Sequence, residues 1–293
     1  EQGRPLPDPD KYAIRLSLYD YEDDFNDYFS DFLKLEGIAN IDTLLLGVWT
    51  EPWLNTPDEA IKQLIDHRAS LPKLSALFIG DIDEEDCMVS FMQQTNLSAI
   101  YEAFPALQTL KTRGTQGLSL GRLQLPQLHT LIMVSQSLDV DILDQISAAE
   151  IPQLSHLELW LGGSGHGYYH VITPEQLANF LTELHKFPKL TSLGLCNYEG
   201  SDELARVISE TGLPPSVTRL DLSNGNLTDE GGRYLLEAAE MLKQLQSLDL
   251  NYHYLSDEMM ERFSKLPLQV DVSSQVEVDE NDSEVFRYIG LFE

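Results

Sequence analysis

The strongest constraint on the fold is a six-residue pattern, L-x-x-L-x-L, that recurs along the 293-residue chain. The first copy starts at residue 41 and the ninth at residue 267, so the eight intervals between copies average about 28 residues. This spacing is typical of a structural repeat and is not expected by chance. Apolar residues at alternate positions predict a half-buried β-strand in every copy. The copies are IDTLLL from Ile41, LSALFI from Leu74, LQTLKT from Leu107, LHTLIM from Leu128, LSHLEL from Leu154, LTSLGL from Leu190, VTRLDL from Val217, LQSLDL from Leu245 and the degenerate PLQVDV from Pro267.

Helix start signals recur between these strands. Thr56 and Thr173 each place a hydroxyl at an N-cap position, followed by proline and acidic residues where the helix dipole favours them. Glu59 and Gln176 stand three residues later, so each pair is predicted to form a capping box. Apolar residues at helical spacing follow, which indicates helices with one buried stripe.

Each repeat is therefore a strand, a loop and a helix, too small to bury its own apolar face. Strands sit ~4.8 Å apart while helices need ~10 Å, so stacked repeats should form an α/β horseshoe solenoid with a concave parallel sheet and helices outside. We expect about nine repeats in one domain, 1–293. It has a strand–helix cap at 1–40, repeats at 41–272 and a cap at 273–293 that folds back over the last repeat. The segment 111–128 is too short and glycine-rich for a full helix.

The best-formed copy, VTRLDLSNGNLTDEGGRYLLEA from Val217, resembles the leucine-rich repeat in its ribonuclease-inhibitor-like α/β form. Stretches such as LPKLSALFIGDI and HYLSDEMMERF are similar to a family of uncharacterised bacterial cytoplasmic leucine-rich-repeat proteins. This resemblance covers nearly the whole chain and implies the fold, with no activity to carry over. The asparagine that usually follows the strand is absent, so the loops at that edge should be irregular. Its place is taken by Gln136, Gly162, Tyr198, Gly225 and His253.

The charge of the chain restricts its partners. With 48 acidic and 19 basic side chains the formal net charge is −29, so we expect neither nucleic acid nor a membrane surface as a partner. No apolar run reaches the ~18 residues of a membrane span, and residues 1–10 do not resemble a signal peptide. The sequence leaves open whether a leader preceded them. Cys87 and Cys196 should stand ~20 Å apart, beyond the ~7 Å limit of a disulfide, and a cytoplasmic location is the resulting expectation.

The stretch HLELWLGGSGHGYYHVITPEQ, residues 156–176, has the strand, glycine-rich loop and helix layout of a phosphate site. It lacks the GK[ST] and GxGxxG motifs and contains no lysine or arginine. His166 and His170 are four residues apart, but the neighbouring glycines argue against the helix that would align them on a metal. We therefore expect a long turn at the rim of the sheet, where aromatic residues could contact a partner. These are Trp160, Tyr168 and Tyr169.

One column of side chains is predicted on the concave face. It consists of the residue between the last two apolar positions of each copy, because side chains alternate along a strand. In the last three copies this residue is Asp221, Asp249 and Asp271, about 5 Å apart, and Glu158 belongs to the same column. The N-terminal half of the column is more apolar, with Leu45, Phe78, Lys111 and Ile132.

These observations predict a non-catalytic protein–protein interaction module that binds a protein or peptide, a basic one, on its concave face. The alternative is an accessory, ligand-binding or cation-binding subunit of a neighbouring enzyme system. No GxSxG motif or activated cysteine is present, so we expect no enzyme, no cofactor and no metal site. The candidate partner-binding residues are Asp221, Asp249, Asp271, Glu158, Trp160, Tyr168, Tyr169, Ser223 and Asn251.

Overall fold

A computed structural model describes residues 11–18, 23–163, 172–277 and 287–291. The chain divides into two compact units. The first comprises Glu1–Val134 and Ala148–Gln153, and the second comprises Ser135–Ser147 and Leu154–Glu293. The prediction of a single domain with two caps stays a prediction.

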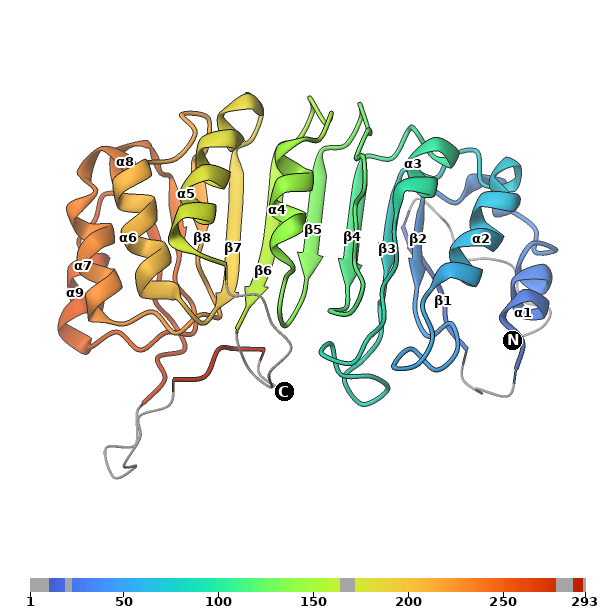
Figure 1. The fold of residues 1–293 in the computed structure, drawn as a ribbon, viewed down its shortest axis with the longest axis horizontal. Coiled ribbons are helices and arrows are strands. Elements are labelled where there is room, and N and C mark those ends of the chain that lie inside the picture. The colour runs from blue at the N-terminus through green and yellow to red at the C-terminus, as the bar shows by residue number, and fades with distance from the viewer. Residues whose placement is uncertain (1–10, 19–22, 164–171, 278–286, 292–293) are drawn as a thin grey trace. The chain divides into compact units, whose positions relative to one another are not determined.

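The first unit contains five parallel strands, each paired with the next in sequence order. They are β1 (Ile14–Leu16), β2 (Thr43–Leu46), β3 (Ala76–Ile79), β4 (Thr109–Arg113) and β5 (Thr130–Val134). The helices of this unit lie on one face of the sheet (Figure 1). They are α1 (Phe25–Phe32), α2 (Asp58–Asp66) and α3 (Ser98–Ala103), with 3-10 turns at Ile38–Asn40 and Arg68–Ser70.

The second unit repeats this arrangement with five more parallel strands in sequence order. They are β6 (His156–Gly162), β7 (Ser192–Tyr198), β8 (Arg219–Asp221), β9 (Ser247–Asp249) and β10 (Gln269–Asp271). Its helices again cover one face of the sheet (Figure 1). They are α4 (Val140–Ser147), α5 (Pro174–Glu183), α6 (Ser201–Thr211), α7 (Asp229–Glu237), α8 (Ala239–Gln244) and α9 (Asp257–Ser264), with a 3-10 turn at Leu184–Lys186.

The repeat pattern places the core. In β2, for example, Leu44 and Leu46 are buried under the helices, while Thr43 and Leu45 on the other face are half-buried. We call that second face, which the helices do not cover, the open face. All nine predicted copies form a strand, β2 to β10, and the strand expected near residue 14 is β1. The predicted fold class, an α/β leucine-rich-repeat solenoid with a parallel sheet and helices on one side, is confirmed.

The predicted helix caps are confirmed at one position and wrong at another. Thr173 forms the complete capping box: its hydroxyl accepts from the Gln176 amide at 3.3 Å, and Gln176 Oε1 accepts from the Thr173 amide at 2.8 Å. Thr56 does not cap α2, because its hydroxyl donates to Asp58 at 2.7 Å and the helix begins after Pro57 without a side-chain cap. Between β4 and β5 the described chain has no helix, as the short, glycine-rich segment predicted.

Other groups replace the missing asparagine at the edge where the strands end. His253 is fully buried and its ring bridges two backbones, with Nδ1 accepting from the Leu255 amide at 3.1 Å and Nε2 lying 2.9 Å from the Val272 carbonyl oxygen. Tyr198 donates its hydroxyl to the carbonyl of Ile172 at 2.9 Å. Different side chains thus satisfy the turning backbone in different repeats.

The end of the described chain, 287–291, folds back as expected but contacts earlier repeats than the last. The Gly290 amide donates to the Asn224 carbonyl at 2.7 Å, and the buried Asn197 side chain pairs with the backbone of Leu291 at 2.7 and 3.3 Å. The outermost strand, β10, remains half-exposed to exposed. No helix in the described residues is long and apolar enough to span a bilayer.

Candidate functional site

In the second unit the residues of the predicted column are aligned across neighbouring strands on the open face. Strand pairing sets its members directly opposite one another, so neighbours are one strand spacing, ~4.8 Å, apart. We call the three aspartates at its end the acidic row. The column runs Glu158, Gly194, Asp221, Asp249, Asp271.

Each aspartate of the acidic row closes the turn that follows its strand. Oδ1 accepts a hydrogen bond from the backbone amide two residues later, at 2.9 Å in all three repeats. Asp271 Oδ1 also accepts from the Ser273 hydroxyl at 2.6 Å. Asp221 also forms a side-chain hydrogen bond with the Cys196 thiol. In the described part of the chain no lysine or arginine forms an ion pair with any of the three aspartates. One carboxylate oxygen of each aspartate therefore serves the fold, while its charge is not balanced by an ion pair.

The environment of the acidic row shifts two pKa values in opposite directions. Partial burial raises the pKa of Asp249, the hydrogen bond from the Asn251 amide opposes this, and the charges of Asp221 and Asp271 on either side raise it further. The side-chain and backbone hydrogen bonds from Ser273 lower the pKa of Asp271, which lies at the exposed end. The folded protein thus disfavours the charged form of Asp249.

We predict that the raised pKa of Asp249 depends on its neighbour. The folded protein binds this proton more tightly than the unfolded chain, so the contribution of Asp249 to stability falls as pH rises from the unfolded-state to the folded-state pKa. Asp221→Asn should lower the pKa of Asp249, because one like charge is removed while the turn acceptor is kept. A carboxyl NMR titration measures this. An unchanged pKa would mean that the charge of Asp221 does not contribute to the shift.

At the other end of the column, Glu158 is already engaged. Its Oε1 accepts from the indole of Trp160 at 2.8 Å, and its Oε2 lies 3.4 Å from His156 Nε2. The expectation that Trp160 begins a rim loop is wrong, because β6 continues to Gly162 and Trp160 pairs in register with Cys196. Trp160 is therefore a fixed, half-buried part of the open face.

Cys196 does not provide a reactive thiol at this site. It is buried, as expected for a structural cysteine. Burial raises its pKa well above the usual range, and the charges of Asp221 and Glu158 raise it further. The thiolate, which is the nucleophilic form, is therefore disfavoured. Cys87 is also a buried thiol.

The remaining candidate residues have structural tasks or lie outside the described residues. Ser223 is buried, and its amide donates to Asp221. Asn251 donates its side-chain amide to the hydroxyls of Ser273 and Ser274 at 2.6 and 3.1 Å. Among the described residues no group of three His, Cys, Asp or Glu side chains could hold a metal ion. The predicted residues outside the described ranges are His166, Tyr168, Tyr169 and His170.

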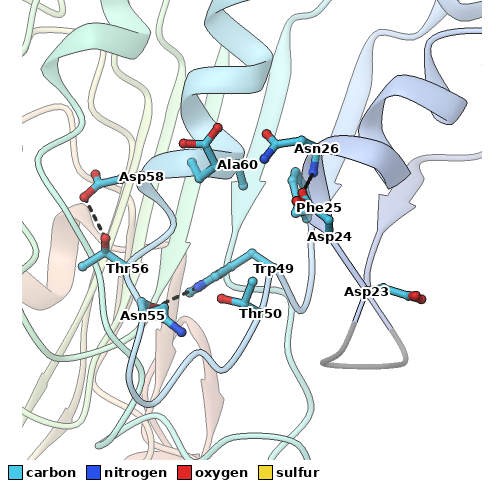
Figure 2. A pocket seen from close by; sticks show the side chains of 11 residues that line it. Asp23, Asp24, Phe25, Asn26, Trp49, Thr50, Asn55, Thr56, Asp58 and Ala60 are labelled. Carbon is cyan, nitrogen blue, oxygen red and sulfur yellow. Dashed lines mark hydrogen bonds between the residues drawn. The ribbon is translucent and has the colours of Figure 1, made fainter.

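The first unit contributes a pocket of about 550 Å³ that the sequence did not reveal. Figure 2 shows it between the starts of α1 and α2, beside the turn after β2. Three of its four carboxylates have local partners: Asp24 caps α1 through the Asn26 amide at 2.7 Å, Asp58 accepts from Thr56, and Glu59 accepts from Gln63 at 3.2 Å. The indole of Trp49 donates to the Asn55 carbonyl at 2.9 Å. Because most of these polar groups are used locally, we assign no ligand to this pocket.

In the first unit the predicted column is apolar at three of its four positions. Leu45, Phe78, Lys111 and Ile132 are consecutive in register. The ammonium of Lys111 lies 4.5 Å from the centre of the Phe78 ring, so this charge packs on its neighbour as a cation–π pair.

Comparison with known proteins supports the fold. No protein-family model matches the chain, and no curated protein matches its sequence. A crystal structure of a structural-genomics protein from Bacteroides fragilis is similar over 95% of this chain and 77% of its own, with a TM-score of 0.83 and 26% identity. An internalin from Listeria monocytogenes shares 15% identity, with a TM-score of 0.36 over 84% of this chain and 71% of its own.

The recurring motif and the strand in every repeat define the class of fold: this chain has the leucine-rich-repeat fold in its α/β form. The narrower resemblance to uncharacterised bacterial cytoplasmic proteins stays a prediction. Folds of this class present extended binding surfaces and typically serve in protein–protein interactions.

Proposed function

We propose that this protein is a non-catalytic interaction module that binds a basic segment of a partner protein at the acidic row. The proposal rests on one observation. Asp221, Asp249 and Asp271 stand side by side, and no lysine or arginine in the described residues forms an ion pair with them. Like charges at this spacing disfavour one another, so a partner cation would relieve the repulsion while the fold supplies the geometry.

The form of the row favours an extended basic segment. Three carboxylates at strand spacing present a line of negative charge roughly 10 Å long. Lysine or arginine side chains of one peptide can reach successive carboxylates, and the ring of Trp160 on the same face adds an aromatic contact of the kind that anchors partners. The chain's net charge of −29 would also accelerate the encounter with a basic partner.

A labelled octalysine peptide tests the proposal by fluorescence anisotropy. The variant D221N/D249N/D271N should bind it about tenfold or more weakly, because it removes three charges and keeps the turn acceptors. A matched control, E183Q/E237Q/E258Q, removes the same charge from exposed positions on helices of the same unit and should bind like the wild type. Equal loss in both variants would reduce the binding to net charge and contradict the proposal.

A further inference from the structure

Exposed apolar side chains gather at one place in the first unit. Five large apolar residues are exposed among those the structure describes, and three of them lie in the loops after β2 and β3. They are Leu54, Met88 and Phe91, exposed to 67%, 42% and 56%. We call these three residues the apolar loop patch. Figure 1 shows the two loops side by side at the edge of the unit where the strands end.

Hydrogen bonds hold the patch together. The Phe91 amide donates to the Met88 carbonyl at 3.2 Å, which places both side chains on one turn. The side-chain amide of Gln93 donates to the carbonyls of Phe91 and Trp53, at 3.2 and 3.5 Å, and the Gln93 backbone amide donates to Pro52 at 2.8 Å. These bonds tie the backbone next to Leu54 to the backbone of the turn that carries Phe91.

The exposure of the patch is built into an ordered loop. Cys87, Val89 and Met92 of the same loop are buried, so its backbone already has a core of its own. Met88 and Phe91 alternate with these anchors and face outward. Because the loop is already ordered, a partner that covers the patch would gain apolar burial without ordering the loop first.

Acidic side chains border the patch. Five carboxylates lie between Asp81 and Asp86, and only part of their charge is balanced. Arg15 pairs with Asp81 at 3.1 Å and Asp83 at 3.7 Å, and Arg113 pairs with Glu84 at 3.6 Å. Glu85 and Asp86 form no ion pair within the described part of the chain. The surface is therefore an apolar centre with a negative rim.

We propose that the apolar loop patch docks a partner segment that is apolar on one face and carries lysine or arginine at its flanks. Apolar burial would supply the contact, and the rim would select the flanking charge. A second copy of this chain fits less well, since a two-fold contact would bring identical acidic rims together. An anionic bilayer fits less well for the same electrostatic reason.

The probe is a synthetic 14-residue peptide of leucine and lysine with an amphipathic helical pattern, titrated by fluorescence anisotropy in physiological salt. The full-length variant L54S/F91S should bind it about tenfold or more weakly than the wild type. Tyr12→Ser is the matched control. Tyr12 is 59% exposed and precedes β1, so it lies at the end where the parallel strands begin, whereas the patch lies where they end. Its replacement should leave the affinity unchanged. Circular dichroism and the thermal midpoint show that each variant is folded.

Further measurements distinguish a basic partner segment from the other possible occupants of the patch, a second copy of this chain and a membrane. E85Q/D86N should weaken binding of this peptide and reduce the salt dependence of binding. When L54S/F91S is introduced into D221N/D249N/D271N, it should cause the same loss of peptide affinity as in the wild type. Peptide binding by L54S/F91S as tight as by the wild type overturns the proposal. So does sedimentation that shows a wild-type dimer and a monomeric L54S/F91S, or binding to phosphatidylcholine vesicles that only the wild type shows. Those outcomes would assign the patch to a second copy or to a membrane.

Discussion

Replacing Asp221, Asp249 and Asp271 together by asparagine should leave the free energy of unfolding unchanged or slightly higher. Alanine at the same three positions should lower it by about 2–4 kcal/mol. Asparagine keeps a side-chain oxygen that can accept from the amide two residues later, and it removes the mutual repulsion that helps to raise the pKa of Asp249. Alanine removes both the charge and the three turn bonds.

Urea denaturation of the two triple variants measures this difference directly. If asparagine destabilised as much as alanine, the charges themselves would stabilise the fold and the row would need no partner cation. If alanine had no effect, the turn bonds would contribute nothing, and the aspartates would be present for binding alone. The comparison thus separates the structural task of these carboxylates from their proposed binding task.

Gly162→Ala should destabilise the protein by about 3 kcal/mol or more, which is the largest effect we expect from a single added methyl group. Gly162 has φ +76°, and a Cβ there would stand 1.7 Å from the Gln136 carbonyl oxygen, which the backbone cannot tolerate without moving. At Gly163 a Cβ would stand 2.6 Å from Oε2 of Glu199, which can move, and 2.9 Å from the Cβ of Glu199, which is held near the backbone. Gly163→Ala should therefore cost less than Gly162→Ala, because no backbone atom is among these nearest contacts and φ at Gly163 is not positive.

Gly212→Ala isolates the backbone part of this effect. Gly212 has φ +79° and ψ −176°, a backbone region that essentially only glycine adopts, and nothing lies within 4 Å of a Cβ built there. Only the backbone conformation is therefore penalised, by about 1–3 kcal/mol. Urea or thermal unfolding of the three variants gives the comparison. A Gly162→Ala variant no less stable than Gly212→Ala would show that the close approach of the chain at Gln136 is not required.

The repeat pattern was sufficient to predict the strands and the face on which each side chain lies. It could not predict where a strand ends, because the last apolar residue of the pattern is not the last paired residue. In the fifth copy the pattern ends at Leu159, yet pairing with β7 continues through Trp160 to Gly162. Pairing with the neighbouring strand places Trp160 inside β6, and this pairing cannot be read from a single sequence.

The position of the acidic row was also predicted, but its turn bonds were missed. The signal was present: an aspartate followed two residues later by serine or asparagine is typical of a side chain that closes its own turn. The apolar loop patch had no comparable signal. In CMVSFM, from Cys87, the exposed Met88 and Phe91 are as apolar as the buried Val89 and Met92, so composition cannot tell which residues face outward.

The central claim, that the acidic row receives a basic partner segment, is tested most directly by the carboxyl NMR signal of Asp249 during titration with octalysine. A bound cation favours the charged form, so the pKa of Asp249 should fall as the peptide saturates the wild type. E183Q/E237Q/E258Q should show the same fall. Saturable peptide binding that leaves the signal and the pKa of Asp249 unchanged would contradict the claim, because the partner would then bind elsewhere.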